Sequence, residues 1–183
     1  MRLVRYADDF VVMVRGKQAD VEKLWNELAD VLAPIGLRLS VEKSGICHID
    51  EGFDFLGFTI KRRSWKGRAG KKAVYTYPSK RSLNAIIDKV RTLTRRARHR
   101  TLADLLARIN PVLRGWASYF HHGVSKRTFS YLDHFTFWRI VGWLRKRHTG
   151  LNWQTIHRRY LPGWVIRDGR YELYRAATDT VSR

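Results

Sequence analysis

The apolar residues of this chain change their spacing once, near residue 79, and this change limits the folds available to it. Before that point they fall into short β-prone runs separated by turn residues, as at residues 3–6 and 10–14. From Ser79 onward they recur every three or four residues, which is the period of an amphipathic helix. Short strands followed by a series of helices predict an α+β chain.

The first sixty residues begin with a predicted β-hairpin whose tip is acidic. Residues 3–14 form two apolar runs around Ala7, Asp8 and Asp9, the pattern of two strands joined by a tight turn. Two adjacent carboxylates repel each other unless a cation lies beside them, and hard oxygen ligands of this kind suit Mg²⁺. Taken alone, an Asp-Asp pair is usually a solvated turn, so its meaning depends on the surrounding sequence.

After this hairpin we expect one helix and three further strands. The helix covers residues 20–33, where apolar residues recur at helical spacing and Asp20 is the expected N-cap. A short strand at residues 37–40 follows, and then a hairpin with strands at 46–49 and 53–60. The predicted first part is therefore a small antiparallel sheet with one helix.

A basic connection and a helical region complete the prediction. Residues 61–72 read KRRSWKGRAGKK, a loop or hairpin tip, and residues 73–77 predict a strand that ends at Pro78. Thr101 and Asp104 have the spacing of a capping box. The expected helices cover residues 79–97, 101–109 with a second stretch to 120 after an interruption at Asn110-Pro111, 125–147 and 153–160. A small hairpin is expected about Asp168-Gly169.

Charge divides the chain close to the same point. The whole chain carries 36 basic and 16 acidic residues, a net charge of +20. Residues 1–60 have a net charge of −3, whereas residues 61–183 have a net charge of +23. Such an excess repels itself unless a polyanion relieves it, so the second part is expected to bind phosphates.

Composition excludes several other classes of protein. The chain is 44% apolar, which is enough for a folded core, and no apolar run approaches the roughly 20 residues that span a bilayer. A single cysteine, Cys47, excludes a disulfide framework and is expected to be a small buried residue in a strand. We therefore expect a protein of a reducing cytoplasm that does not associate with a membrane.

Four sequence blocks resemble the reverse transcriptases encoded by group II introns. The blocks are Tyr6-Ala-Asp-Asp-Phe10, Gly36-Leu-Arg-Leu-Ser-Val-Glu-Lys43, Phe53-Asp-Phe-Leu-Gly-Phe58 and Asn110-Pro-Val-Leu-Arg-Gly-Trp-Ala-Ser-Tyr-Phe120. In order, they are similar to the YADD signature of the palm, the block after it, the primer-grip hairpin and the signature of the maturase domain, also called domain X or the thumb. The resemblance implies a partial palm at residues 1–60, a basic connection at 61–78 and a helical thumb or maturase domain at 79–183.

The resemblance also implies roles for single residues. Asp8 corresponds to the metal-binding aspartate of the palm, Asp9 to its neighbour, and Lys43 to a lysine near the departing pyrophosphate. The implied primer-grip residues are Phe55, Leu56 and Gly57. Mg²⁺ is the implied cofactor, because two-metal phosphoryl transfer stabilises the attacking and leaving oxygens.

One departure from the family's pattern limits the expected activity. Family polymerases use a further metal-binding aspartate from a palm strand far upstream of YADD, and only five residues precede Tyr6. We therefore expect this chain alone not to polymerise DNA. It corresponds to a C-terminal portion of the enzyme, a degenerate reading frame, or one half of a split polymerase that needs an N-terminal partner.

The remaining region corresponds to the module with which relatives bind their intron RNA, assist its splicing and hold the template–primer duplex. Duplex RNA is recognised by its shape, phosphates and 2′-OH groups, which calls for cations on a helical face. The expected partners are structured group II intron RNA and an RNA–DNA template–primer. The candidate RNA-binding residues are Arg62, Arg63, Lys66, Arg68, Lys71, Lys72, Arg91, Arg95, Arg96, Arg98, Arg100 and Arg114.

Other interpretations remain open from sequence alone. Basic helices are often only solvated, and Trp116 and Tyr119 are expected to pack the thumb. An exposed palm sheet can also pair with a second copy of the chain and give a homodimer. The tryptophans expected in the core first, and as stacking platforms second, are Trp138, Trp143, Trp153 and Trp164.

Overall fold

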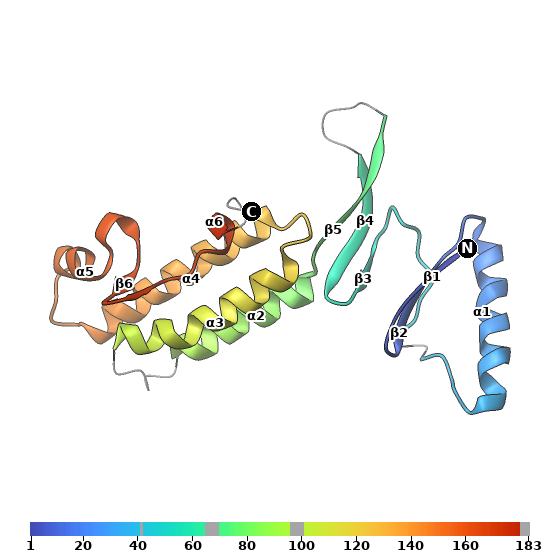
Figure 1. The fold of residues 1–183 in the computed structure, drawn as a ribbon, viewed down its shortest axis with the longest axis horizontal. Helices are drawn as coiled ribbons and strands as arrows, with labels where there is room; N and C mark the ends of the chain where they lie inside the picture. The colour runs from blue at the N-terminus through green and yellow to red at the C-terminus, as the bar shows by residue number, and fades with distance from the viewer. Residues whose placement is uncertain (41, 65–69, 96–100, 180–183) are drawn as a thin grey trace. The chain divides into compact units, whose positions relative to one another are not determined.

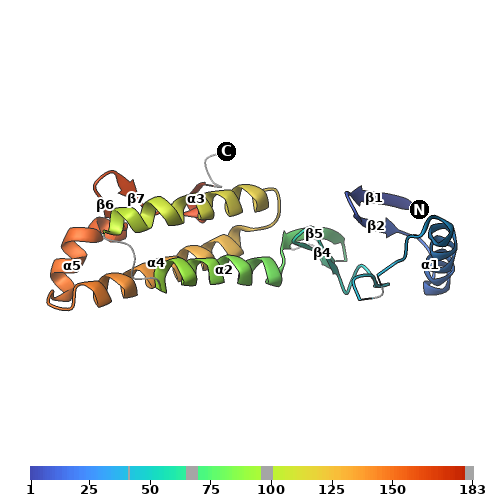
Figure 2. The same ribbon diagram turned by 90° about the horizontal axis from the view of Figure 1, so that it is seen from below.

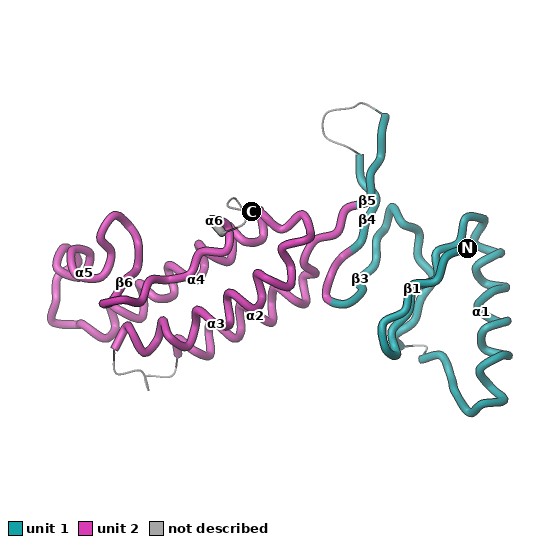
Figure 3. The backbone as a smooth tube through the Cα atoms, in the orientation of Figure 1, with its two compact units in different colours: residues 1–56, 60–74 teal, residues 57–59, 75–183 magenta. Residues whose placement is uncertain are grey.

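The computed structural model describes residues 1–40, 42–64, 70–95 and 101–179. The chain divides into two compact units, coloured separately in Figure 3. Unit 1 comprises Met1–Leu56 and Ile60–Val74, and unit 2 comprises Gly57–Thr59 and Tyr75–Arg183. Most of the strands lie before residue 79 and most of the helices after it (Figure 1), which confirms the predicted α+β class.

Unit 1 begins with a tight hairpin. Strands β1 (Arg2–Tyr6) and β2 (Asp9–Met13) are antiparallel, with Tyr6 opposite Asp9. Only Ala7 and Asp8 lie between the strands, and Ala7 has a φ of 50°. A positive φ at this position matches the turn to the right-handed twist of the strands. The predicted hairpin is confirmed, with Asp8 in its turn and Asp9 at the start of β2.

The next element of unit 1 is the helix α1 (Gln18–Leu32). Its N-cap is Lys17, whose backbone N–H donates to Asp20 Oδ2 at 2.8 Å. The expectation that Asp20 itself is the N-cap is wrong, because this carboxylate caps from the third helical position. A short 3₁₀ turn, η1 (Ala33–Ile35), ends at Gly36, whose φ of 76° is left-handed and favours glycine.

The second sheet differs from the prediction at its first strand. Its order is β3 (Phe53–Phe55), β4 (Phe58–Ser64) and β5 (Lys72–Pro78). The predicted strands at 37–40 and 46–49 are wrong, because these residues have no regular secondary structure. The chain turns at Leu56 and Gly57. The first strand of the sheet, β3, therefore pairs with β4 directly after it and not with a strand before it.

Cys47 lies in the irregular segment before β3. It is exposed and outside the strands of the described residues, so its expected burial in a strand is wrong. The physical reason is the absence of a strand at 46–49, which removes the sheet face that was expected to cover the thiol.

Unit 2 is built on three long helices. They are α2 (Lys80–Arg95), α3 (Leu102–Phe120) and α4 (Lys126–Arg147). In Figure 1, α2 runs alongside α3 and α4, and it packs against both. The predicted apolar stripes form the packed faces, where the side chains of Val90, Leu105 and Phe129 are 0% exposed. Burial of these stripes stabilises the three helices together, because helix stability in proteins comes mainly from tertiary packing.

The helix α3 is a single helix. Its predicted capping box is confirmed, since Thr101 Oγ1 accepts the Asp104 N–H and Asp104 Oδ2 accepts the Thr101 N–H, both at 3.1 Å. The expected interruption at Asn110-Pro111 is wrong, because the helix continues through Pro111. Ile109 and Leu113 are 0% and 2% exposed, so packing on both sides of the proline keeps the helix continuous.

The chain after α4 forms short elements. They are α5 (Trp153–Tyr160), η2 (Pro162–Trp164), β6 (Arg167–Asp168), β7 (Tyr171–Glu172) and α6 (Ala176–Asp179). The predicted helix at 153–160 and the predicted hairpin about Asp168-Gly169 are confirmed. Figure 2 shows this β6–β7 hairpin next to α3, which it contacts.

Three polar side chains hold this C-terminal segment against the long helices. Asn110 donates to the Glu172 carbonyl at 2.7 Å and accepts the Tyr174 N–H at 2.9 Å. Asp168 Oδ2 accepts the Ala103 N–H at 3.0 Å. Asp133 accepts the N–H groups of Ala176 and Ala177, each at 2.9 Å, at the start of α6. Backbone groups at the ends of α3 and α6 are thereby satisfied.

The core of the described residues lies in unit 2. None of the described residues of unit 1 is buried. Trp143 is 9% exposed and lies in the core as expected. The core interpretation is wrong for three other tryptophans, whose rings contact neighbouring rings but leave a large part of each side chain open to solvent. The exposed tryptophans are Trp138 at 50%, Trp153 at 38% and Trp164 at 55%. In the described parts of the chain, no helix combines the length and apolar character that crossing a membrane requires.

Candidate nucleic-acid interface and acidic hairpin

The acidic hairpin places two carboxylates next to each other at an exposed tip. Asp8 lies in the turn and Asp9 begins β2, and both residues are exposed. The Arg5 Nε–H donates to the Ala7 carbonyl at 3.0 Å and braces the turn from the neighbouring strand. The site therefore rests on a defined backbone conformation.

The metal-binding capacity of this tip is partial. Within the described ranges, no three His, Cys, Asp or Glu side chains gather in a way that could hold a metal ion. Mg²⁺ requires six oxygen ligands in near-octahedral geometry, and two carboxylates leave most of that shell to other groups. Asp8 and Asp9 thus fit part of a magnesium site, and no catalytic step follows from these two residues alone.

Lys43 lies in a turn before the second sheet. Its backbone N–H donates to the Ser40 carbonyl at 3.1 Å, and its side chain is exposed. Lys43 thus follows residues 37–40, where a strand was expected and none is formed. Among the described residues, no hydrogen bond or ion pair joins Lys43 to Asp8 or Asp9.

The implied primer-grip residues come together in one turn. Phe55 ends β3, and Leu56 and Gly57 have φ values of 50° and 78°. The Gly57 carbonyl accepts the Ser79 N–H at 2.8 Å and the Ser82 hydroxyl at 2.9 Å. A Cβ atom at Gly57 would lie 2.9 Å from Ser82 Oγ, so both the conformation and the close approach require glycine here.

The predicted basic connection forms parts of β4 and β5, and two of its cations are held by Asp50. Arg62 Nε and Nη2 donate to the two Asp50 carboxylate oxygens at 2.7 and 3.0 Å, and Lys72 Nζ donates to Oδ2 at 3.1 Å. Hydrogen bonds from Arg62 and then Lys72 hold the pKa of Asp50 well below its usual range. These two cations are therefore committed to an ion-pair cluster.

The structure describes only some of the other candidate cations in this connection. Arg63 lies in β4 and Lys71 directly before β5, and both side chains are exposed. Lys66 and Arg68 lie outside the described residues. The ion pairs with Asp50 connect β4 and β5, so the structure brings Arg62 and Lys72 together.

Three candidate RNA-binding residues lie on the long helices. Arg91 is exposed on α2, where it forms an ion pair with Asp88 at 2.9 Å and lies 5.5 Å from the Phe135 ring. Arg95 is exposed in the last turn of α2. Arg114 is exposed on α3, with its guanidinium 5.3 Å from the Tyr174 ring. Arg96, Arg98 and Arg100 lie outside the described residues.

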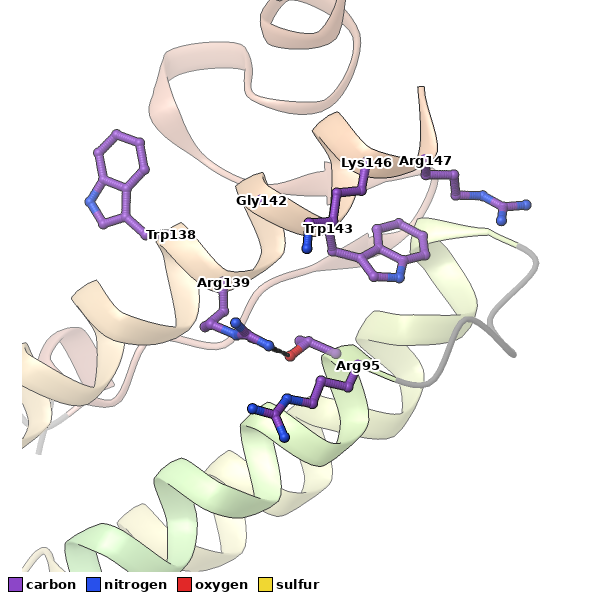
Figure 4. A pocket seen from close by; sticks show the side chains of 8 residues that line it. Arg95, Trp138, Arg139, Gly142, Trp143, Lys146 and Arg147 are labelled. Atoms are coloured by element: carbon purple, nitrogen blue, oxygen red, sulfur yellow. Dashed lines mark hydrogen bonds between the residues drawn. The ribbon is translucent and has the colours of Figure 1, made fainter. Parts of the chain in front are cut away.

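Sequence reasoning missed a group of cations on α4. A depression of about 490 Å³ lies between the end of α2 and the second half of α4 (Figure 4). Arg139, Trp143 and Lys146 line it from α4 at spacings of four and three residues, which place side chains on one helical face. That spacing was the available sequence signal. The residues that line the depression are Thr94, Arg95, Trp138, Arg139, Gly142, Trp143, Lys146 and Arg147.

The acidic side chains of unit 2 for which the structure gives contacts serve local structure. Asp104, Asp133 and Asp168 accept backbone N–H groups at helix ends. Two others form exposed ion pairs, Asp88 with Arg91 and Glu172 with Arg167 at 3.3 Å. Exposed Lys and Arg side chains occur on every helix from α2 to α5. The positive charge of the described part of unit 2 therefore remains largely available to an external polyanion.

Two family models match the chain. The model described as "Group II intron, maturase-specific domain" matches residues 83–161, which run from α2 to the residue after α5. The model described as "Reverse transcriptase (RNA-dependent DNA polymerase)" matches residues 1–60, which include the acidic hairpin. The chain carries a reverse-transcriptase segment and a group II intron maturase domain. This confirms the family indicated by the four sequence blocks.

Curated proteins similar to the chain include intron-encoded ones. Protein YkfC of Escherichia coli K12 is 40% identical over 95 residues, which are 48% of this chain and 24% of that protein. A COX1/OXI3 intron 2 protein of Saccharomyces cerevisiae is 36% identical over 66 residues, 36% of this chain and 8% of that protein. The group II intron-encoded protein LtrA of Lactococcus lactis subsp. cremoris is 32% identical over 90 residues, 48% of this chain and 14% of LtrA.

The chain thus aligns with a quarter or less of the length of these relatives. Reverse transcriptases are in general polymerases that depend on divalent metal ions. Maturase and reverse-transcriptase domains in general bind intron RNA and template–primer duplexes.

Proposed function

We propose that unit 2 binds the structured RNA of a group II intron and assists its splicing, and that it helps to hold the template–primer in RNA-directed DNA synthesis. The observation that carries this proposal is the coincidence of the maturase match at residues 83–161 with helices that present the excess positive charge. Cations on helical faces suit duplex RNA, which is recognised mainly through its phosphates and 2′-OH groups.

The experiment that tests this proposal measures binding to a group II intron RNA at several salt concentrations. A shuffled RNA of equal length is the control ligand. If about six phosphates are neutralised, affinity should fall roughly a thousandfold between 50 and 200 mM salt. Equal affinity for the two RNAs, or an affinity that does not change with salt, contradicts the proposal.

A matched pair of variants locates the binding surface. Replacement of Arg95 and Arg114 by Gln removes two exposed charges from α2 and α3 and should weaken binding, with a salt dependence reduced by about two counterions. Replacement of Arg15 and Lys23 by Gln removes the same charge from unit 1 and should leave the affinity nearly unchanged. An equal loss in both variants would indicate that only net charge matters.

We further propose that residues 1–60 contribute to an RNA-directed DNA polymerase site in a larger assembly. The reverse-transcriptase match and the paired carboxylates of the hairpin support this role. Asp8 and Asp9 would supply part of a Mg²⁺ site, Lys43 would lie near the departing pyrophosphate, and the turn that ends at Gly57 would support the primer end. When bound, the metal would stabilise charge on the reacting oxygens.

Primer extension tests this second role. The chain is combined with a polypeptide that supplies the rest of a reverse-transcriptase domain, and activity is expected only in the combination. Asp8→Ala should abolish the gained activity, whereas Asp30→Ala, at an exposed position of α1, should retain it. Activity that survives Asp8→Ala contradicts the assigned metal ligand.

Self-association is an alternative role for unit 1, favoured by its uncovered apolar residues. Leu3 is 58% and Val4 is 42% exposed, on opposite faces of a two-stranded sheet. An unpaired edge strand is a ready site for pairing with another chain, so a homodimer is the expected form in light scattering. A monodisperse monomer contradicts this alternative. The proposed location remains the bacterial cytoplasm, in association with nucleic acid.

A further inference from the structure

The depression between α2 and α4 combines positive charge with aromatic rings. Four of its lining residues are cations, and none of the described lining residues is acidic. Its cations come from two helices, with Arg95 in the last turn of α2 and Arg139, Lys146 and Arg147 in α4. Gly142 lies between these α4 cations, so no side chain occupies that point of the wall. A volume of about 490 Å³ is in the range of ligand-sized pockets.

Arg139 is held in place before any ligand arrives. Its Nε and Nη2 groups donate to Thr94 Oγ1 at 3.3 and 3.1 Å, as the dashed lines in Figure 4 show. Thr94 is 6% exposed, and its own hydroxyl donates to the Val90 carbonyl at 2.8 Å. The threonine oxygen is thereby fixed as an acceptor. A guanidinium oriented in this way loses less conformational entropy when it binds a phosphate.

Trp138 stands at the outer edge of the same depression (Figure 4). Its side chain is 50% exposed, and tryptophan is enriched at binding surfaces because its ring combines a large apolar area with a polar N–H group. Neighbouring rings support it on its own helix, with Phe137 at 5.3 Å and His134 at 6.2 Å between centroids. One part of the ring therefore rests on α4, and the rest faces solvent at the edge of the depression.

We infer that this depression binds an unpaired nucleotide of the RNA, with the base stacked on Trp138 and the adjoining phosphates on Arg95, Arg139 and Lys146. The inference rests on the proposed RNA binding and specifies the feature that is recognised. Bases within a duplex are stacked on one another and cannot offer a face to an indole, whereas bulged and loop bases can. Stacking on an aromatic side chain is tolerant of base identity, so the site selects an extruded base and not a sequence.

The test compares two RNA hairpins that differ by one nucleotide. One carries a single bulged 2-aminopurine in its stem, and the other has a fully paired stem of the same length. The wild-type chain should bind the bulged RNA between about fivefold and a hundredfold more tightly, as expected for stacking of one base on an aromatic ring. The fluorescence of the bulged 2-aminopurine should also be quenched on binding, because it reports stacking.

Variants at Trp138 assign the effect to this ring. Trp138→Ala should remove the preference and the quenching while it leaves affinity for the paired RNA unchanged, and Trp138→Phe should restore most of both. Tyr131→Ala is the matched control, because Tyr131 is 52% exposed on the same helix and does not line the depression. Unchanged affinity for paired RNA also shows that the variants are folded.

The outcomes separate this inference from the proposed function. Tight binding of both RNAs with equal affinity, or an equal loss for both in Trp138→Ala, overturns the nucleotide site and leaves RNA binding intact. Failure of the wild-type chain to bind either RNA at 50 mM salt overturns both. Displacement of the bulged RNA by polyglutamate as effectively as by unlabelled bulged RNA would assign the depression to an acidic protein partner and overturn the inference.

Discussion

The two units contain similar amphipathic patterns but differ in what covers the apolar residues. In unit 2 the helical stripes face one another, and Val90, Leu105 and Phe129 are 0% exposed. In unit 1 the stripe of α1 has no buried residue, and Val31 within it is 69% exposed. Amphipathic periodicity therefore indicates a face that gains stability when covered, but it does not show that the same unit provides the cover.

This difference has an energetic consequence. Burial of apolar surface stabilises a fold by about 25 cal/mol per Å², and unit 2 obtains this from its packed helices. Unit 1 has a two-stranded sheet, and a hairpin of this kind is marginally stable in water by itself. We therefore expect unit 2 to supply most of the stability of the chain and unit 1 to gain order from a further polypeptide surface.

The largest expected effect is in amide hydrogen exchange of the intact chain. Core amides of unit 2, such as those of Val90 and Leu105, should exchange only through global unfolding, whereas those of Val11 and Leu24 in unit 1 should exchange through local opening. With an ordinary stability of about 5 kcal/mol or more, the difference should exceed about a thousandfold. Comparable protection in α1 and α2 would show that the two units are equally stable and remove the comparison.

The sequence predicted elements well where a local pattern and its tertiary partner agree. The helix at 153–160 and the capping box at Thr101 and Asp104 required only nearby residues. The hairpin with Asp8 at its tip was predictable for the same reason, since two residues between apolar runs define the turn.

Other features depended on contacts distant in the sequence. The alternation at 37–40 suggested a strand, but a strand needs a hydrogen-bonded partner, and these residues have no regular structure. Pro111 was expected to break its helix, yet buried neighbours on both sides preserve it. The depression beside Trp138 is lined by side chains from the end of α2 and the second half of α4, and no local pattern indicates that these two segments lie against each other.

The second prediction compares equivalent substitutions in the two units. Leu105→Ala removes a fully buried side chain from α3 and should lower the free energy of unfolding by about 2–5 kcal/mol. Leu24→Ala removes a half-buried side chain from α1 and should cost less than about 1 kcal/mol. Urea unfolding followed by far-UV circular dichroism measures both. Equal losses would mean that the α1 stripe is packed in solution as tightly as the core of unit 2.

The smallest effect concerns one carboxylate in each unit, whose pKa values should shift in opposite directions. In unit 1, hydrogen bonds from Arg62 and Lys72 hold the pKa of Asp50 below its ordinary value of 3.8. In unit 2, burial raises the pKa of Asp133, and the N–H groups at the start of α6 and the charge of Arg175 offset this only in part. Carbon-13 NMR titration of the two carboxyl groups measures both values.

These shifts give stability contributions of opposite sign. Asp50 binds fewer protons in the folded state, so its contribution is present above pH 3.8 and is lost as the pH falls through its lowered pKa. Asp133 binds more protons in the folded state, so its contribution is present below pH 3.8 and is lost as the pH rises through its raised pKa. Asp50→Asn should therefore reduce the change of the free energy of unfolding with pH below pH 3.8. Asp133→Asn should reduce the change of that free energy with pH above pH 3.8. If the pKa values of Asp50 and Asp133 both lay above 3.8, or both below it, the contrast between the exposed ion-pair cluster and the desolvated helix cap would be contradicted.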